Sequence, residues 1–455
     1  MLSFEDDFFL LPDEVVERVL VIGGGIAGIQ AALDVADAGC DVILVEREPS
    51  LGGRMAQLES MFPTLDHAVC ALRAKMVEVI THPRITALTY SSIEAFQGLG
   101  GEFEVGIKKR TRKVTDACTG CGICWSKCPR EVSSEFDLGL GRRKTIFIPF
   151  AQAIPRIPSI DVNNCYHFAQ DCQICSNACP VGCIDFDQQD QHVTEKVGAV
   201  IVATGFKPFD PVGLPEYGFG KYPDVITSLQ LERLLSGAGP TKGEVYRPSD
   251  GNTPRSVVFV SCVGPRDGLL DQPNCSRIGC INTAKQAVAL AKLYNGIKIG
   301  VFYPGPLPTE RGSGELLRRA RDEFNVEYLD GKVTKIEQKE KALAVVGHAA
   351  TEGGTVEREA ELVVLAVEME ASTGIEELAA EIGILCDRDG YLMRADVKLQ
   401  PVETTVPGIF VAGAAAGPCD IGESVVRGSA AATRAIIYLN KLRQRLEKRS
   451  SENLD

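Results

Sequence analysis

The sequence has no hydrophobic run long enough to span a membrane and no excess of positive charge. A membrane-spanning helix needs about 20 consecutive apolar residues, and no stretch of the 455 residues reaches that length. Residues 1–13 are acidic and lack the basic start and apolar stretch of a signal peptide. The net charge of -13 argues against a nucleic-acid partner, because phosphate contacts need clustered lysine and arginine. We therefore expect a cytoplasmic protein with no direct membrane span and no nucleic-acid partner.

The sequence also has no internal repeat and no low-complexity segment. Its 45% hydrophobic and 24% charged residues are typical of a globular protein, and its length predicts two or three domains. Cysteine, by contrast, is abundant, with 16 residues. In a reducing compartment, closely spaced cysteines are more often metal ligands or redox groups than disulfides.

A Gly-x-Gly-x-x-Gly pattern stands between a predicted strand at 19–22 and a predicted helix at 29–38. Its glycines are Gly23, Gly25 and Gly28. The first allows a tight turn, the second lets a pyrophosphate approach the backbone, and the third lets the helix pack on the strand. The start of the helix offers N–H groups and a positive dipole to phosphates. This pattern predicts a dinucleotide site.

A carboxylate also supports the dinucleotide site, and two later segments favour FAD over a nicotinamide as its ligand. Glu46 ends the next predicted strand, at the distance from the glycines where a carboxylate binds ribose hydroxyls. Residues 198–205 resemble the strand and Ala-Thr-Gly turn of two-dinucleotide flavoproteins, and their turn is Ala203, Thr204 and Gly205.

The strand that closes the FAD site of such flavoproteins is matched by residues 407–413, which end in Gly413. These enzymes usually place aspartate directly after that glycine, but here the next residue is Ala414. Asp420 is the candidate for the missing ribityl contact, and the alternative is that it caps a helix.

The segment 114–192 interrupts the alternation of strands and helices and contains two ferredoxin-like cysteine runs. The runs are Cys118-x2-Cys121-x2-Cys124-x3-Cys128-Pro129 and Cys165-x6-Cys172-x2-Cys175-x3-Cys179-Pro180. In two-cluster ferredoxins, three closely spaced thiolates bind one [4Fe-4S] cluster and the fourth binds the other. The predicted ligand sets are Cys118, Cys121, Cys124 and Cys179 for one cluster, and Cys165, Cys172, Cys175 and Cys128 for the other.

Zinc is the competing interpretation, because Cys-x2-Cys pairs also bind zinc tetrahedrally. Zinc does not require a third thiolate followed by x3-Cys-Pro, a pattern that occurs twice here. Cys183 is left over, and we expect it to be a small buried residue. A flavin exchanges two electrons and clusters exchange one, so together they make an electron-splitting or electron-relaying protein.

Residues 255–350 return to alternating strands and helices, which predicts a second parallel sheet. The predicted strand at 257–260 is followed by residues 261–267, which lack the glycine pattern of a phosphate-binding turn. We therefore expect no nicotinamide nucleotide at this position.

The chain resembles the A subunits of the heterodisulfide reductases, the flavoproteins of a cytoplasmic electron-bifurcating complex. The likeness covers nearly the whole chain, and besides the ferredoxin-like segment it is carried by residues 51–58, 62–64, 75–79, 82–83, 261–267 and 275–280. We count Gly53, Arg54 and Met55 of the first stretch, with Arg47, among the FAD-binding residues. The resemblance also implies that Lys285 lies near flavin N5 and stabilises the reduced flavin; the alternative is a solvated helix lysine.

The resemblance further implies a cluster on four cysteines that end in an adjacent Cys-Cys pair. This chain has Cys262, Cys275 and Cys280, but Gly279 in place of one member of that pair. The options are an empty site, a three-iron cluster or a fourth ligand from elsewhere.

We therefore predict an α/β fold with two Rossmann-like units of the thioredoxin reductase type and an inserted two-cluster ferredoxin-like domain. The FAD-binding domain is expected in three parts, the ferredoxin-like domain between the first two, and a degenerate nucleotide domain between the last two. The expected ranges are 14–113, 193–250 and 366–446 for FAD binding, 114–192 for the ferredoxin-like domain and 251–365 for the degenerate domain.

The predicted function is that of an oxidoreductase, an FAD and iron–sulfur electron-transfer subunit of a heterodisulfide reductase-like complex. We expect electron bifurcation between a two-electron donor, ferredoxin and a disulfide or other acceptor. The alternative is a non-bifurcating relay in a quinone-linked or sulfur-oxidising complex. Expected partners are the other subunits, ferredoxin or a hydrogenase- or formate dehydrogenase-type donor, and a second copy of the chain in a homodimer.

Overall fold

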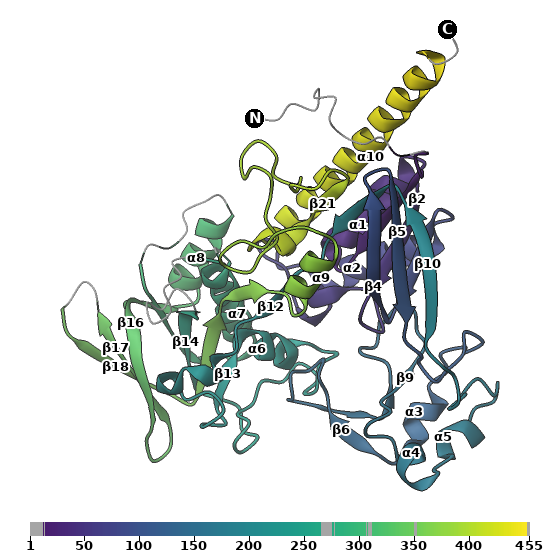
Figure 1. Cartoon of the computed structure of the whole chain (residues 1–455). Helices are drawn as coiled ribbons and strands as arrows, with labels where there is room; N and C mark the ends of the chain where they lie inside the picture. The colour runs from purple at the N-terminus through teal and green to yellow at the C-terminus, as the bar shows by residue number, and fades with distance from the viewer. Residues whose placement is uncertain are drawn as a thin grey trace.

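The computed structural model describes residues 12, 14–264, 275–276, 278–305, 307, 312–349 and 353–452 (Figure 1). It has two large sheets and a small cysteine-rich insertion. In Figure 1 the second sheet lies at the left, the insertion at the lower right, and the end of α10 (Ile421–Glu452) projects at the top. The predicted α/β class with parallel sheets is confirmed.

The first sheet is parallel, and its strands come from distant parts of the chain. In order across the sheet they are β21 (Ile409–Val411), β11 (Ala199–Val202), β1 (Arg18–Ile22), β2 (Asp41–Glu46) and β3 (Ile85–Thr89). Such strands read as continuous apolar runs because both of their faces are covered.

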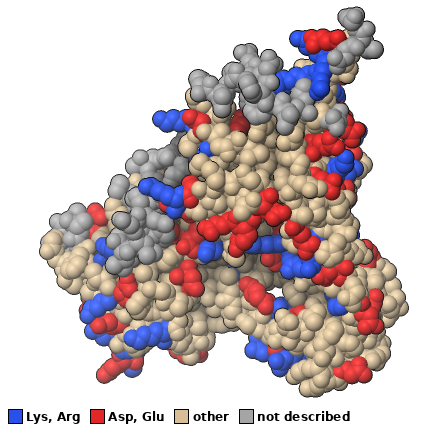
Figure 2. Space-filling view, viewed as in Figure 1, with Lys and Arg blue, Asp and Glu red and all other residues tan. Residues whose placement is uncertain are grey.

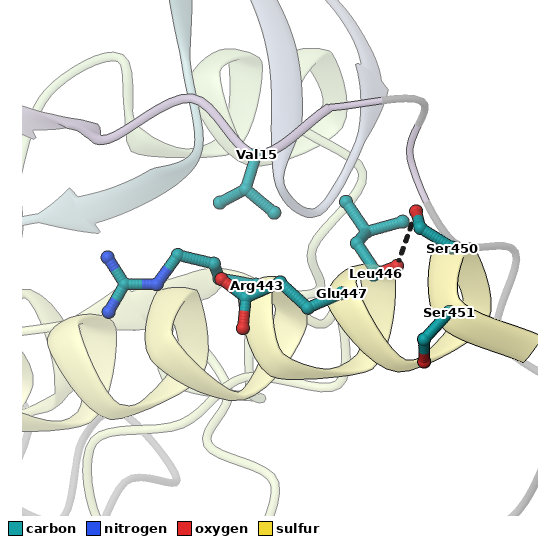
Figure 3. Close-up of a pocket in the computed structure, with 6 residues that line it drawn as sticks. All are labelled: Val15, Arg443, Leu446, Glu447, Ser450 and Ser451. Carbon is teal, nitrogen blue, oxygen red and sulfur yellow. Dashed lines mark hydrogen bonds between the residues drawn. The ribbon is translucent and has the colours of Figure 1, made fainter.

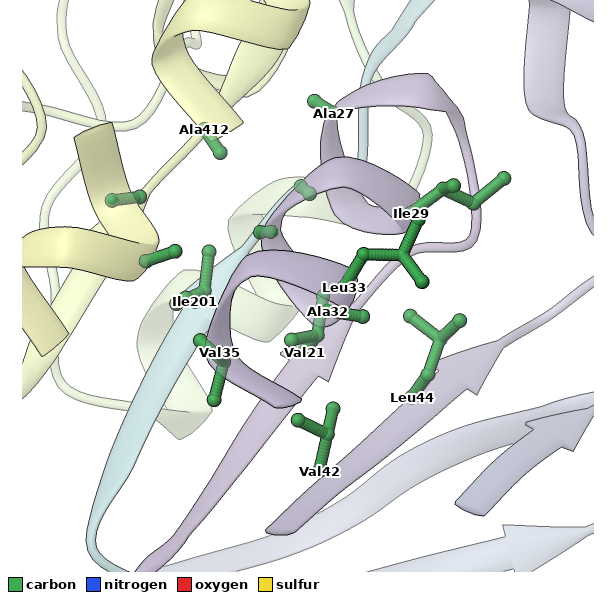
Figure 4. Close-up of a cluster of buried hydrophobic side chains, with 14 of the residues drawn as sticks. Val21, Ala27, Ile29, Ala32, Leu33, Val35, Val42, Leu44, Ile201 and Ala412 are labelled. Atoms are coloured by element: carbon green, nitrogen blue, oxygen red, sulfur yellow. The ribbon is translucent and has the colours of Figure 1, made fainter. Parts of the chain in front are cut away.

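Helices cover one face of the first sheet, and an antiparallel sheet covers the other. The helices are α1 (Ile26–Asp37), α2 (Ala68–Thr81) and α10, and the antiparallel strands are β4 (Ser91–Leu99), β5 (Glu102–Lys109) and β10 (Gln191–Val197). Alternate residues of β1 point to the two sides. Val19 and Val21 pack in the core with α1 and α10 (Figure 4), whereas Leu20 and Ile22 pack against the antiparallel sheet.

The second sheet has seven strands. Their order is β13 (Val225–Thr227), β19 (Leu362–Val367), β14 (Ser256–Val263), β15 (Lys298–Tyr303), β16 (Glu327–Gln338), β17 (Leu343–Ala349) and β18 (Thr355–Ala360). The first five are parallel, and the last two extend the sheet as antiparallel strands. Helices α6 (Ser228–Leu235), α7 (Gly279–Leu293) and α8 (Ser313–Asp322) pack on this sheet.

The insertion begins after β5 and ends before β10, and these two strands pair with each other. It contains three short helices and two small hairpins. These elements are α3 (Ile123–Lys127), β6 (Glu131–Ser133), β7 (Arg142–Lys144), β8 (Ile146–Phe147), β9 (Ser159–Ile160), α4 (Tyr166–Gln170) and α5 (Ile174–Asn177). Because its two ends are adjacent, the insertion does not interrupt either large sheet.

The paired strands β12 (Phe206–Pro208) and β20 (Met369–Ala371) lie on the two segments that connect the large sheets. Helix α9 (Ile375–Glu381) packs on the first unit. Four short 3-10 helices of the described residues are η1 (Gly53–Gln57), η2 (Pro211–Gly213), η3 (Pro215–Tyr217) and η5 (Gly413–Ala416). Within the described part of the chain, no helix combines the length and the apolar character that crossing a membrane requires.

Candidate functional site

The glycine turn after β1 is fixed by close backbone contacts. Gly23 has a φ of 110°, and a Cβ there would lie 2.4 Å from the Ala203 carbonyl oxygen. A Cβ on Gly28 would lie 1.9 Å from the Gly23 oxygen. A Cβ on Gly25 would meet only the Cα of Gly53, at 3.9 Å, so the backbone at Gly25 is open to a ligand. A pyrophosphate at this turn fits that arrangement.

Glu46 lies at the carboxyl end of β2 with only 6% of its surface exposed. Its carboxylate accepts hydrogen bonds from the Gly24 N–H at 2.6 Å and the Glu48 N–H at 2.7 Å. Burial raises the pKa of Glu46, although these two hydrogen bonds act in the opposite direction. The carboxylate is thereby held in one position beside the glycine turn.

A cavity of about 1090 Å³ opens beside this turn, between the two large sheets and the insertion. Twelve of the predicted site residues line it. They are Gly23, Gly25, Glu46, Arg47, Gly53, Arg54, Met55, Ala203, Thr204, Gly205, Lys285 and Asp420. Gly28 and Gly413 do not line it; both pack closely on neighbouring backbone or helix atoms. The Thr204 hydroxyl is buried in the described structure without a hydrogen-bond partner, so a ligand in the cavity could use it.

Charges of both signs line the cavity mouth. Figure 2 shows acidic and basic side chains meeting across the middle of this face. Glu377 and Glu381 of α9 contribute acidic side chains, and Arg47, Arg54 and Arg110 contribute basic ones. The arginines suit the phosphates of a dinucleotide.

Asp420 caps helix α10. Its side chain accepts a hydrogen bond from the Glu423 N–H at 2.7 Å, and the Glu423 carboxylate accepts one from the Asp420 N–H at 3.2 Å. This reciprocal pair is a capping box. The residue also lines the cavity, so the ribityl contact stays a prediction beside the observed cap.

Lys285 is buried at the cavity wall and is not a solvated helix lysine. Its ammonium lies 2.9 Å from the Glu232 carboxylate of α6, and the two side chains are 2% and 1% exposed. It also donates a hydrogen bond to the Ser60 carbonyl at 2.8 Å. Glu232 accepts further hydrogen bonds from the Gln286 side chain and the Glu59 N–H. Sequence reasoning missed Glu232, and no local signal marks it, because its partner lies on another helix.

The cysteines of the insertion gather in one small core. Burial raises the pKa of Cys124 to about 11, and the nearby Cys118 and Cys121 act in the same direction. A small hollow is lined by these three together with Cys179 and Cys183.

The other four ferredoxin-like cysteines form a second group. Burial raises the pKa of Cys175 to about 12, and the nearby Cys165 and Cys128 also raise it. Burial also raises the pKa of Cys165, with contributions from Cys128 and Cys172. These neighbours are compatible with the two predicted ligand sets, which stay a prediction, although Cys183 lies in the first hollow as well.

Cys183 is buried, with 4% exposed. Its sulfur lies 3.4 Å from the sulfur of Cys179. In the described residues, no three or more histidine, cysteine, aspartate or glutamate side chains are arranged to hold a single metal ion.

Two of the three cysteines of the predicted third cluster, Cys275 and Cys280, stand in the sequence next to the start of α7, and the cluster itself stays a prediction. Cys262 is near the carboxyl end of β14 with a φ of 60°, and Cys280 is in the first turn of α7, close to Tyr328. Cys275 is exposed and stands four residues before Gly279. Residues 265–267 and 277 of the family-like segments lie outside the described residues.

A separate hollow lies between Val15 and the last turns of α10 (Figure 3). Its wall is formed by Arg443, Leu446, Glu447, Ser450 and Ser451. The Ser450 hydroxyl donates a hydrogen bond to the Leu446 carbonyl at 2.9 Å. None of the predicted site residues lies there.

Known proteins show clear similarity to this chain. Residues 18–109 match the FAD dependent oxidoreductase family. The A-type iron-sulfur subunit of the CoB--CoM heterodisulfide reductase of Methanocaldococcus jannaschii is 42% identical over 443 residues, which are 96% of this chain and 67% of that protein. The chain belongs to the family of heterodisulfide reductase A subunits. Two further members of the family, from Methanopyrus kandleri and Methanococcus maripaludis, are 45% and 40% identical over 94% and 96% of this chain.

Family membership confirms the predicted resemblance. The chain spans about two thirds of the length of these relatives, 65% for the Methanopyrus kandleri protein. Thioredoxin reductases from T. acidophilum and Lactococcus lactis share its fold, with TM-scores of 0.53 and 0.52. They are 15% and 14% identical and cover 94% and 93% of this chain and 99% of their own chains. The predicted thioredoxin reductase type of fold is confirmed.

Proposed function

We propose that this chain is an electron-transfer subunit that exchanges electrons between an FAD in the large cavity and two [4Fe-4S] clusters in the insertion. One observation carries the proposal: the segment that holds the two cysteine groups also forms part of the cavity wall. Phe136, Arg143, Phe147 and Phe150 of the insertion line the same cavity as the glycine turn.

FAD fits the residues present. Gly25 leaves the backbone open to phosphates, Arg47 and Arg54 supply positive charge, and the buried Thr204 hydroxyl is available as a partner. When bound, the flavin would accept electrons in pairs and release them singly. Lys285 and Glu232 place a buried ion pair at the wall, and the ammonium is the member of the pair that would favour an anionic reduced flavin.

The insertion offers a short connection between the cavity and the cysteine groups. Arg143 and Phe147 line the cavity, and between them Thr145 places its hydroxyl oxygen 3.4 Å from the Cys128 sulfur. Phe136 and Phe150 are stacked with ring centroids 5.0 Å apart, and they help to keep water from this region. We propose that the cluster on Cys128, Cys165, Cys172 and Cys175 exchanges electrons with the flavin first.

Zinc in the cysteine groups is the competing proposal. Two predicted groups of four thiols, each completed by a cysteine from the other run, suit the interlocked ligation of two-cluster ferredoxins. A zinc site with four cysteine ligands needs only two Cys-x2-Cys pairs and does not call for a third thiolate followed by x3-Cys-Pro.

The finer proposal concerns the complex. The relative from Methanococcus maripaludis is named as the A subunit of an H(2)/formate:CoB-CoM heterodisulfide,ferredoxin reductase. By analogy, we propose that this chain works with further subunits, in a homodimeric assembly, and divides electron pairs between ferredoxin and a disulfide or other acceptor. We also propose the domain boundaries and the cytoplasmic location that the sequence predicts.

Photoreduction tests the electron-transfer proposal directly. Light in the presence of a sacrificial donor reduces FAD in the anaerobic chain, and cluster absorption is followed with time. We expect cluster bleaching to follow flavin reduction in the native chain and to be slower in the Cys175→Ser variant. Clusters that stay oxidised next to fully reduced flavin would contradict the proposal. Bifurcation is tested by the two one-electron potentials of the flavin, which must be crossed and widely separated.

A further inference from the structure

The tip of the insertion, residues 134–141, contacts both large units of the protein. Phe136 packs against the core of the first sheet, and Leu140 packs against the core of the second. The Leu138 carbonyl accepts a hydrogen bond from the Gln230 side chain of α6 at 3.1 Å. The Phe136 carbonyl accepts one from the Gln57 side chain at 2.9 Å. The tip therefore bridges α6 and the end of η1 beside the flavin cavity.

An ion pair joins this tip to α6. The Arg233 guanidinium lies 3.0 Å from the Asp137 carboxylate, and the side chains are 3% and 18% exposed. Arg233 also lies over the Phe136 ring, 4.8 Å from its centroid. Asp137 is held in turn by the Ser134 hydroxyl at 2.8 Å. The tip thus supplies both a carboxylate and an aromatic ring to Arg233.

Arg233 is the sequence neighbour of Glu232, and three charged side chains bind consecutive parts of the segment 57–60. The Gln57 carbonyl accepts a hydrogen bond from Arg233 at 3.3 Å. The Glu59 N–H donates to Glu232 at 3.0 Å, and the Ser60 carbonyl accepts from Lys285 at 2.8 Å. Asp137, Arg233, Glu232 and Lys285 therefore form a row of alternating charges that ends at the cavity wall.

Burial makes each member of this row depend on the next. Glu232, Arg233 and Lys285 are 0%, 2% and 2% exposed, so water screens their charges poorly. A buried charge that loses its partner is strongly unfavourable. Without Asp137, Arg233 would turn to the carboxylate of the adjacent Glu232, which is the partner of Lys285.

We infer that Asp137 and Arg233 are positioning residues for the flavin cavity: the cluster-bearing insertion fixes Arg233, which leaves Glu232 to hold the Lys285 ammonium at the wall. The inference rests on the proposed function, because it takes a flavin to occupy the cavity. It assigns to the insertion a second role, in setting the charge that the flavin meets.

The test measures the midpoint potential of FAD bound to the full chain, by equilibration with redox dyes, in Asp137→Asn, Arg233→Gln and the double variant. Asp137→Asn leaves an uncompensated cation and is expected to raise the potential, because positive charge favours the reduced flavin. Arg233→Gln removes a cation and is expected to lower it. The double variant removes both charges and is expected to return close to the native value. A loss of packing alone would not produce shifts of opposite sign.

The matched control is Glu131→Gln. Glu131 pairs with Lys144 at 2.8 Å on the same insertion hairpin, but the two side chains are 46% and 29% exposed, and neither lines the cavity. Solvent screens this pair, so the flavin potential is expected to stay unchanged. If Arg233→Gln does not fold, Asp137→Asn and the neutral double variant still give the comparison.

A second measurement asks whether the effect passes through Lys285. In a Lys285→Met background, Asp137→Asn is expected to shift the flavin potential by half as much or less, because coupled residues are not additive. A full-sized shift of the flavin potential in that background overturns the inference. Shifts of the same sign in Asp137→Asn and Arg233→Gln also overturn it, and so do shifts no larger than that of Glu131→Gln. These outcomes leave FAD and iron contents unchanged, whereas a chain that binds no FAD overturns the proposed function as well.

Discussion

Replacing Lys285 by methionine should destabilise the protein far more than replacing an exposed lysine of the same helix. The substitution keeps much of the apolar stem and removes the ammonium that lies 2.9 Å from Glu232. Glu232 would stay buried with an uncompensated charge. Its remaining partners are the Gln286 side chain at 2.5 Å and the Glu59 N–H at 3.0 Å.

The expected magnitude follows from the geometry. Breaking a buried ion pair by removing one partner costs about 3–5 kcal/mol. Because two hydrogen bonds to Glu232 survive, the lower end of about 3 kcal/mol applies, which is roughly a hundredfold in the unfolding equilibrium constant. The double variant Glu232→Gln with Lys285→Met removes both charges, so it should lose less than Lys285→Met alone.

The assay is urea unfolding at a fixed excess of FAD, followed by far-UV circular dichroism. The matched control is Lys292→Met, because Lys292 is exposed on the same helix α7. A surface substitution of this kind should change stability by no more than about 0.5 kcal/mol. Equal stability of the Lys285→Met and Lys292→Met variants would refute the buried pair as described.

Three further predictions follow from single positions. Gly28→Ala should abolish FAD binding, measured as flavin absorbance per chain, because the new Cβ would lie 1.9 Å from a carbonyl oxygen of the glycine turn. The control Gly213→Ala should bind FAD normally, because nothing lies within 4 Å of a Cβ at that position. Cys175→Ser should lose about half of the iron and keep its FAD, whereas Cys386→Ser, outside both cysteine groups, should keep all of its iron. Burial raises the pKa of Glu46, so the stabilising contribution of this side chain is complete below the unfolded pKa of about 4.3 and is lost as the pH rises through the folded pKa. Over that pH range, the urea midpoint of the flavin-free native protein should fall relative to that of the Glu46→Gln variant. Parallel pH profiles of the two proteins would contradict this.

The glycine turn could be predicted because its requirements are local. Tight turns and close backbone approach admit only glycine, so the spacing of Gly23, Gly25 and Gly28 already encodes the geometry. The spacing of the cysteines predicts two ligand sets in the same local way, and these sets stay a prediction.

The row of charges could not be predicted, because it depends on contacts between distant segments. Nothing near Glu232 or Arg233 in the sequence indicates that their partners lie on α7 and on the insertion. Likewise, Asp137 is an ordinary turn residue by sequence, and only the docking of the tip against α6 gives it a buried cation. Helix α7 begins at Gly279, and Gly279 lines the cavity, which the glycine itself does not indicate.

We propose that one chain holds an FAD and two [4Fe-4S] clusters. The most direct measurement is the iron, sulfide, zinc and FAD content of anaerobically purified protein, with low-temperature EPR after reduction. We predict about eight irons, about eight sulfides and one FAD per chain, with the EPR signal of two interacting clusters. About three or four additional irons would place a further cluster at Cys262, Cys275 and Cys280. Zinc in place of iron, or a chain without flavin, would contradict the account.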